Sequence, residues 1–275
     1  MKIKFLGTGA ALGIPAPFCS CRVCENARAK KGKDIRSRSG LIIDGQMMID
    51  YSPDNFLRAA LNGENLIGIK YFLITHDHFD HLDVTALAES IDQGKSCNEQ
   101  ISRYFYGNEK VCSALDREFK KAETDKINIH SVIKAYRPTI IGDYKVTALN
   151  AEHDVNQDSF VYLIQNDGKT YFHCCDSGVI TEQTLNFLIN TSVKLDAVLF
   201  DATFGLRKEK FYGHMNLEQV VCLCEKLREL SIIDKDTKVF LTHISHSGRC
   251  THDELAKTAQ KNGINVAYDG LEIEI

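Results

Sequence analysis

The chain has 275 residues, of which 44% are hydrophobic and 25% are charged, and this globular composition excludes a disordered chain or a collagen-like fibre. The 37 acidic residues outnumber the 33 basic ones, and the net charge of −4 argues against a surface that coats nucleic acid. The 10 cysteines are too few for a disulfide scaffold and predict a reduced, cytoplasmic protein in which Cys serves the core, metal binding or catalysis.

The hydrophobic pattern predicts strands and helices that are mixed along the whole chain. Residues 1–6 alternate apolar and basic side chains, as a half-buried strand does, and the turn at Asp44-Gly45-Gln46 predicts a hairpin of 41–43 with 47–49. Further strands are expected at 71–75, 103–106, within 139–151, and at 160–165, 170–174, 195–200, 238–242 and 264–268. Helices are expected at 54–61, 83–91, 109–121 and 216–230, and after the capping pattern of Thr251 and Glu254. With no linker or repeat, we expect one domain over residues 1–275, with two packed sheets and helices outside.

The N-terminal residues resemble a signal peptide only faintly. Gly7, Gly9, Gly13 and Pro15 interrupt the apolar stretch, so we expect mature sequence here. No apolar run in the sequence approaches the roughly 18 residues that cross a bilayer, and we expect no membrane partner.

The most informative segment follows the buried strand at 71–75 and reads His76-Asp77-His78-Phe79-Asp80-His81. Buried imidazoles and carboxylates cost free energy unless they are paired or ligated. His76 and His78 are two residues apart and can point to the same side of an extended turn, while Asp80 and His81 can face a second ion. Imidazole and carboxylate together suit Zn²⁺, Mn²⁺ or Fe²⁺ rather than Ca²⁺. The alternative is a polar loop that happens to be rich in His.

This segment resembles the signature of the metallo-β-lactamase superfamily, whose fold is a four-layer αββα sandwich of the α/β class. The other positions of the family pattern occur in order at strand ends, as Asp50, His153, Asp176 and His243. The resemblance implies two divalent ions, Zn or Mn, with a bridging hydroxide as the nucleophile. It assigns His76, His78 and His153 to one ion, Asp80, His81 and His243 to the other, Asp176 to both, and Asp50 to orienting a ligand imidazole.

A second cluster contains three thiols, in Cys19-Ser20-Cys21-Arg22-Val23-Cys24. A closed structural zinc site needs four ligands, and His246 can be the fourth if the two loops meet. The alternative is three free thiols. Together with Gly7-Thr8-Gly9, the cluster resembles the PhnP-type phosphodiesterases, which hydrolyse cyclic ribosyl phosphates. That resemblance implies a structural zinc loop near 19–24, held by Cys19, Cys21, Cys24 and His246.

His214 lies just before Asn216, the predicted N-cap of a helix, where anions bind and where an imidazole suits proton transfer. The resemblance gives it the role of general acid or phosphate contact, and His214 and Asp80 are the candidate catalytic residues.

The basic run from Arg28 to Arg38 is either a solvated face or a device that steers anionic substrates, and Arg38 and Ser39 are expected nearest the metals.

The remaining cysteines and histidines have an ordinary interpretation. Cys174 and Cys175 are expected to pack in their strand, and Cys222 and Cys224 to be core or half-buried. His130, His173 and His252 belong to no motif.

The favoured function is a metal-dependent phosphodiesterase acting on a small, possibly cyclic, phosphate ester. The alternatives are a tRNA 3′-processing nuclease, a lactone or thioester hydrolase, and an inactive metal-binding regulatory protein. Against the nuclease, residues 177–242 contain no long Gly/Pro-rich basic arm. We expect no nucleic-acid partner, leave a homodimer open, and place substrate contacts within residues 82–152.

Overall fold

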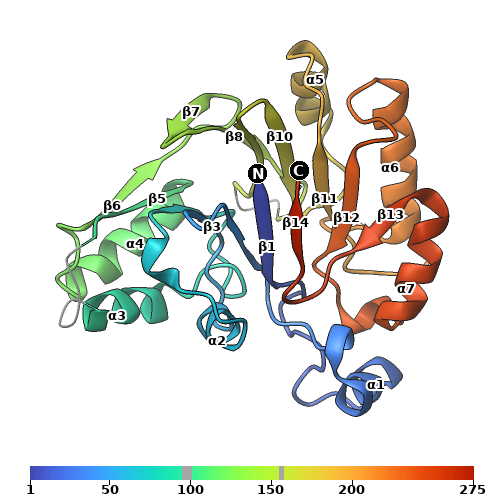
Figure 1. Cartoon of the computed structure of the whole chain (residues 1–275), viewed down its shortest axis with the longest axis horizontal. Helices are drawn as coiled ribbons and strands as arrows, with labels where there is room; N and C mark the ends of the chain where they lie inside the picture. Colours follow the sequence, from blue (N-terminus) through green and yellow to red (C-terminus); the bar gives the residue numbers. More distant parts are fainter. Residues whose placement is uncertain (95–100, 155–157) are drawn as a thin grey trace.

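The structure is a computed structural model that describes residues 1–94, 101–154 and 158–275 (Figure 1). Residues 95–100, part of the segment in which substrate contacts are expected, lie outside the described residues. Two seven-stranded sheets pack face to face, in the orders β14-β1-β2-β3-β4-β5-β6 and β13-β12-β11-β10-β9-β8-β7. Each sheet mixes parallel and antiparallel pairs.

The first sheet contains β1 (Lys2–Gly7), β2 (Gly40–Ile43), β3 (Met47–Ile49), β4 (Tyr71–Leu73), β5 (Arg103–Gly107), β6 (Asn128–Val132) and β14 (Glu272–Glu274). The second contains β7 (Pro138–Ile141), β8 (Tyr144–Asn150), β9 (Phe160–Asn166), β10 (Lys169–Cys174), β11 (Ala197–Asp201), β12 (Lys238–Thr242) and β13 (Ile264–Val266). The α-helices of the described residues are α1 (Arg22–Lys30), α2 (Asn55–Leu61), α3 (Val84–Gly94), α4 (Glu109–Lys121), α5 (Glu182–Asn190), α6 (Leu217–Glu229) and α7 (His252–Ala259).

The core lies in three layers because the central strands are buried on both faces. In β11, Leu199 faces the other sheet, whereas Val198 and Phe200 face the helices, as the two-residue period of a strand requires. A strand covered on both sides needs apolar residues throughout, which explains the unbroken apolar run of β11. Burying one such side chain contributes about 1.5–3 kcal/mol to folding.

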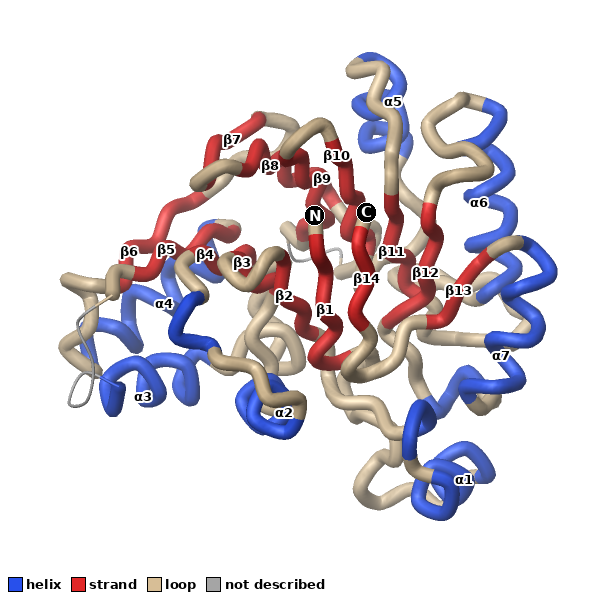
Figure 2. Tube along the Cα trace, in the orientation of Figure 1, coloured by secondary structure: helices blue, strands red, loops and turns tan. Residues whose placement is uncertain are grey.

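Helices cover the outer face of each sheet, so the order of layers is helix, sheet, sheet, helix (Figure 2). Leu115 and Phe119 of α4 pack with Phe105 on the first sheet. On the second sheet, Leu223 and Leu227 of α6 belong to the same core cluster as Phe200 and Leu241 of β11 and β12. This arrangement confirms the predicted αββα sandwich. No helix in the described ranges has the length and apolarity to cross a bilayer.

The segment after β1 joins the two sheets at one end of the molecule. Gly9 forms isolated bridges with both Arg38 and Ile244, which precede β2 and follow β12 respectively. Gly7 is required where this segment begins, because a Cβ there would lie 1.8 Å from the carbonyl oxygen of Arg38. The N-terminal loop is therefore held close to the ends of the strands that carry the candidate site.

Most predicted elements lie where the sequence placed them, with differences of one to three residues at their ends. Asn216 caps α6 and Thr251 caps α7, each with a complete capping box. Two helices, α1 and α5, and two strands, β6 and β14, were not predicted. Cys222 is exposed on α6, so its expected burial was wrong, whereas Cys224 is buried as expected.

Candidate active site

The candidate site lies at the carboxyl ends of parallel strands, where side chains of neighbouring strands meet. The pair β3 and β4 is parallel, and so are β10, β11 and β12. Three of the candidate residues adopt a left-handed backbone as they leave these strands: Asp50 (φ 61°), Asp176 (φ 52°) and His243 (φ 56°). Such conformations cost free energy in residues other than glycine and are retained where a site depends on them.

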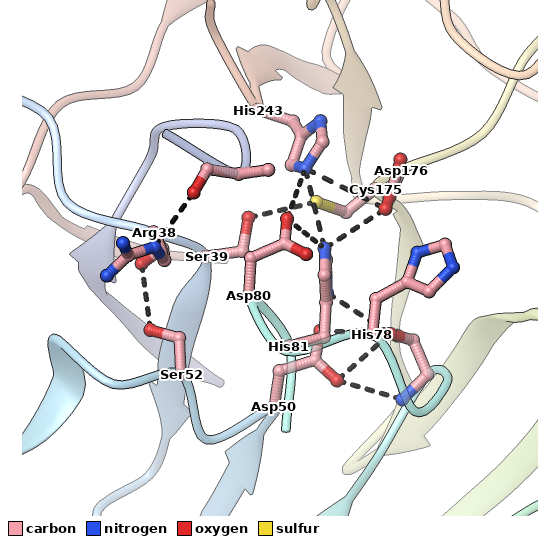
Figure 3. A network of polar contacts seen from close by, with 12 residues as sticks. Arg38, Ser39, Asp50, Ser52, His78, Asp80, His81, Cys175, Asp176 and His243 are labelled. Carbon is pink, nitrogen blue, oxygen red and sulfur yellow. Dashed lines mark hydrogen bonds and ion pairs between the residues drawn. The ribbon is translucent and has the colours of Figure 1, made fainter. Parts of the chain in front are cut away.

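The loop after β4 carries candidate metal ligands that come from the first sheet. The backbone amides of His81 and Leu82 both donate to the carbonyl oxygen of His78, at 2.9 and 2.8 Å, and so fix the turn. His76, Asp80 and His81 are buried, while His78 is partly open to solvent. Figure 3 shows that the side chains of Asp80 and His81 point toward His243, with the His78 ring to one side of them.

The first donor set contains His76, His78, His153 and Asp176. His76 Nε2 lies 3.3 Å from Asp176 Oδ2, and His153 Nε2 lies 3.3 Å from His78 Nδ1. Two donors bound at about 2.0–2.2 Å to a tetrahedral ion lie about 3.3–3.6 Å apart. The spacing of this set therefore fits one transition-metal ion.

The second donor set contains Asp80, His81, His243 and again Asp176. His81 Nε2 lies 3.1 Å from Asp176 Oδ2, 3.4 Å from His243 Nε2 and 3.6 Å from Asp80 Oδ2. All four residues are buried. Asp176 is common to the two sets, so its carboxylate can bridge two ions.

Two buried atoms at the centre of these sets make no hydrogen bond within the described residues: His76 Nε2 and Asp176 Oδ1. Both have polar neighbours within about 3.3 Å, but without hydrogen-bond geometry. A buried polar atom without a partner costs free energy, and a bound cation would remove that cost. These orphaned atoms, together with the donor chemistry, show that the residues fit a pair of divalent ions.

The electrostatics of Asp176 also favour cations. Burial alone would raise the pKa of this carboxyl, but the surrounding imidazoles of His243 and His214 outweigh burial and hold the pKa well below its usual range. Burial lowers the pKa of His76 to about 4, with His81 adding to the effect. Asp176 therefore stays ionised and His76 neutral near pH 7. Burial lowers the pKa of His243, but Asp176 and Asp201 raise it to about 9, so a cation that binds there would displace a proton from this ring.

Carboxylates behind the imidazoles hold the rings in place. His81 Nδ1 donates to Asp50 Oδ2 at 2.6 Å, which leaves Nε2 facing Asp176. His243 Nδ1 lies 3.1 Å from Asp201 Oδ2 in the same way. Asp50 thus lies where the sequence placed it, behind a candidate ligand.

Asp201 is the residue that the sequence analysis missed. It ends β11, is fully buried, and accepts backbone hydrogen bonds from Thr203 at 2.8 Å and Met215 at 3.0 Å. One feature of the sequence could have revealed Asp201. It comes directly after a predicted buried strand, as the other acidic candidates do.

His214 lies against the shared carboxylate. Its Nδ1 is 3.1 Å from Asp176 Oδ1 and 3.0 Å from Asp201 Oδ2. Burial lowers the pKa of His214, but Asp201 and Asp176 outweigh burial and raise the pKa to about 10. The ring is a quarter exposed, so it lies within reach of both solvent and the centre.

The structure brings together the cysteine cluster and His246. His246 Nδ1 lies 3.4 Å from Cys19 Sγ and 3.6 Å from Cys21 Sγ, and the donor atoms of Cys19, Cys21, Cys24 and His246 all lie within 4.8 Å of one another. The loops meet because Ala10 donates to the carbonyl oxygen of Ile244 at 3.1 Å. Although burial raises the pKa of Cys21, hydrogen bonds from the Cys24 backbone and His246 lower it to about 6. The set fits a closed, tetrahedral zinc site.

The basic run is not a uniformly solvated face. Arg36 is only 3% exposed and donates to Thr8 Oγ1 and to the carbonyl oxygen of Ala267, each at 2.7 Å. Ser39 lies near the centre, with its Oγ 3.6 Å from Cys175 Sγ, whereas Arg38 turns toward Asp54. The expectation of a solvated run was therefore wrong for Arg36.

A model of the beta-lactamase superfamily domain matches residues 46–244, which span both donor sets. An octanoyltransferase from Porphyromonas gingivalis is 36% identical over 86 residues, which are 30% of this chain but only 16% of that protein's length.

Two solved structures are similar over the whole chain. Zinc-bound PqqB from Methylobacterium extorquens has a TM-score of 0.75 at 18% identity, covering 100% of both chains. A diphosphatase from the PhnP family has a TM-score of 0.74 at 24% identity, covering 100% of this chain and 97% of its own. At these identities the likeness shows a shared fold.

Proposed function

Since the chain belongs to the beta-lactamase superfamily of metal-dependent hydrolases, we propose that it hydrolyses a small phosphate ester, and most directly a phosphodiester. The observation that carries the proposal is the pair of donor sets that share Asp176, with the protonated His214 lying against that carboxylate. A small, possibly cyclic ribosyl, phosphate is the substrate class that we favour.

In this proposal His76, His78, His153 and Asp176 hold one ion, and Asp80, His81, His243 and Asp176 hold the other. When bound, the two ions supply an activated water and neutralise charge on the phosphoryl oxygens.

The chain's own residues keep this centre in order. Asp50 holds the His81 ring through Nδ1, and Asp201 holds the His243 ring through Nδ1, so that the other nitrogen of each ring is free to bind. His214 carries a proton beside the centre and donates it to the leaving ester oxygen. An alkoxide leaving group needs such a proton, because it is a poor leaving group when it is charged.

A phosphate ester is favoured over a thioester because of His214. A thiolate leaves readily as an anion, whereas an alkoxide expelled from phosphorus gains from a positioned acid. A lactone also expels an alkoxide, so the substrate screen below separates it from a phosphate ester. The raised pKa of His214 keeps it in the donating form near pH 7.

A tRNA 3′-processing nuclease is the less favoured alternative. Residues 177–242 are fully described and contain α5, β11, α6 and their connections, so the chain carries no long arm there to hold a tRNA. The net charge of −4 also opposes binding to a polyanion. An inactive regulatory protein is disfavoured because both donor sets are complete.

A substrate screen tests the proposal. The protein would be loaded separately with Zn²⁺ and Mn²⁺ and assayed with a cyclic ribosyl phosphate, a linear aryl diester, a tRNA precursor and a lactone. We expect turnover of the cyclic phosphate or the diester above that of the other two. Turnover confined to the lactone, or absence of any turnover by a fully metallated protein, would contradict the proposal.

Replacing His214 by Ala should slow hydrolysis of the cyclic ribosyl phosphate, which expels an alkoxide, by about 10²–10⁴-fold while the metal content stays the same, because the variant lacks the proton donor. Initial rates and elemental analysis of the same preparation measure both quantities. His130→Ala is the matched control, since His130 lies by Asp116 of α4. An unchanged rate in His214→Ala would remove this residue from the mechanism.

A further inference from the structure

We propose that Phe79 forms one wall of a subsite that binds a planar aromatic ring in the substrate, so that the protein prefers phosphate esters whose ester group carries such a ring. This inference rests on the proposed hydrolysis of phosphate esters and narrows its substrate class. The subsite would bind the ester group that stays attached to phosphorus and not the leaving group.

Phe79 lies between two candidate ligands in the sequence, and its own side chain is exposed. Its neighbours His78 and Asp80 both belong to the donor sets, and Asp80 is buried. The Phe79 side chain is 56% exposed. Because the hydrogen bonds from His81 and Leu82 to the His78 carbonyl oxygen fix the turn, the ring is held at the rim of the centre rather than on a free loop.

A cation covers one face of the Phe79 ring. The Arg38 guanidinium carbon lies 5.4 Å from the ring centroid, within the range of a cation–π contact. Arg38 is fixed in turn, because its Nε donates to the carbonyl oxygen of Ala11 at 2.8 Å and its Nη1 to Asp54 Oδ1 at 2.9 Å. Figure 3 shows Arg38 next to Ser39, with the hydrogen bond from Ser52 to its carbonyl oxygen.

A ring that is backed by a cation and more than half exposed is suited to stack with a second ring. Offset or edge-on aromatic pairs gain free energy beyond the area that they bury. A phosphoryl group held at the donor sets would place its ester substituent at the rim, within reach of the residue next to Asp80. The observations therefore point to a planar aromatic group, whether from a nucleobase or from another arene.

The surface beside Arg38 can accommodate a group larger than one ring. Arg38 also lines a groove of about 330 Å³ between the N-terminal loop and α2. The groove includes Leu12 and Leu57, each more than half exposed. Apolar side chains thus lie in a groove lined by the same arginine that contacts Phe79.

The test uses two substrates that share the p-nitrophenolate leaving group and differ in the other ester group: bis(p-nitrophenyl) phosphate and methyl p-nitrophenyl phosphate. We expect the metal-loaded protein to have a higher kcat/KM for the aryl ester. Phe79→Ala should reduce that preference by about tenfold, with the metal content unchanged. Phe79→Trp should restore it, because indole stacks as phenyl does.

Phe56→Ala is the matched control, because Phe56 is 63% exposed on α2 and does not line the groove. Its substrate preference should equal that of the unmodified protein. If Phe79→Ala keeps the aryl preference, or changes only the oligomeric state, Phe79 serves a protein interface and the inference is wrong.

Equilibrium binding separates this inference from the proposed function. Calorimetric titration with phenyl phosphate and methyl phosphate needs no turnover. Tighter binding of phenyl phosphate that is lost in Phe79→Ala supports the ring subsite, even if no diester is hydrolysed. The absence of any preference, including the absence of binding to both ligands, overturns it.

Discussion

The imidazoles of the candidate centre work in pairs with buried carboxylates. His81 and His243 each use Nδ1 to contact a carboxylate, Asp50 and Asp201 respectively, and so present Nε2 to Asp176. A hydrogen bond of this kind selects the tautomer, fixes the ring and increases the basicity of the free nitrogen. Asp50 and Asp201 would thus tune the affinity of the second donor set, to which both His81 and His243 belong.

Replacing Asp201 by Asn should weaken metal binding by about 10–100-fold, because a neutral amide of the same size cannot stabilise His243 and His214 as the carboxylate does. Competition with a chromophoric chelator measures the affinity. The rate of hydrolysis should fall together with the metal affinity when the concentration of metal is limiting.

Asp196→Asn provides the control for this experiment. Asp196 immediately precedes β11, the strand that Asp201 ends, and pairs with Lys169 in a partly exposed salt bridge. Loss of this salt bridge should leave metal binding unchanged, because most exposed ion pairs contribute little to the stability of a protein. Equal affinity in Asp201→Asn and the unmodified protein would show that Asp201 has no part in the centre.

Among the helices and strands, prediction from the sequence worked best where a capping residue and a set of buried apolar residues indicate the same element. The helix α6 has a side-chain cap at Asn216, as predicted, and buries Leu217, Val220, Cys224 and Leu227 along one face. The helix α1 was missed because its N-cap is Cys21, which makes no side-chain capping bond, and because its residues share the segment with the cysteine cluster. Capping signals cannot reveal a helix that begins at a candidate metal ligand.

Prediction of the site had a similar limit. The candidate ligands were found because their residue types are close in sequence or end predicted strands, and the structure brings these donors together. Asp201 was not found, because its partner His214 is 13 residues away and neither residue indicates the other. Arg36 was misread because only tertiary contacts, with Thr8 and Ala267, show that a residue in a charged run enters the core.

The cysteine cluster joins the start of α1 to the turn after β12. Replacing Cys21 by Ser should remove one zinc per chain and lower the midpoint of thermal unfolding, because a structural site contributes its binding energy to folding. Elemental analysis and thermal denaturation measure the two effects. The two-ion centre should keep its metals in the folded variant.

Cys222→Ser is the matched control, since Cys222 is exposed on α6 and belongs to no donor set. Both its metal content and its unfolding midpoint should be unchanged. A folded Cys21→Ser protein that retains its zinc but loses turnover would contradict a structural role for the cluster.

At the level of the whole molecule, the candidate centre lies where the two sheets meet. His76, Asp80 and His81 follow a strand of the first sheet, whereas Asp176 and His243 follow strands of the second. Ions held there would link the sheets and neutralise buried carboxylates. The centre should therefore stabilise the fold as well as catalyse.

Removing the ions with a chelator should lower the midpoint of thermal unfolding by about 10 °C, since a ligand at a thousand times its Kd contributes about 4 kcal/mol. Differential scanning calorimetry before and after chelation measures the shift, and added Zn²⁺ or Mn²⁺ should reverse it. A metal-free protein, verified by elemental analysis, with an unchanged midpoint would show that the ions do not link the sheets.

The strand β14 follows the whole second sheet in sequence, yet it completes the first by pairing with β1, with Lys2 opposite Glu274. In the sequence, strands of the first sheet therefore come both before and after all the strands of the second. Contacts across such a separation form slowly, because the entropy of loop closure is lost before the contact is gained. During refolding, secondary structure should recover first. Metal uptake, which needs donors from both sheets, should mark the last stage of assembly.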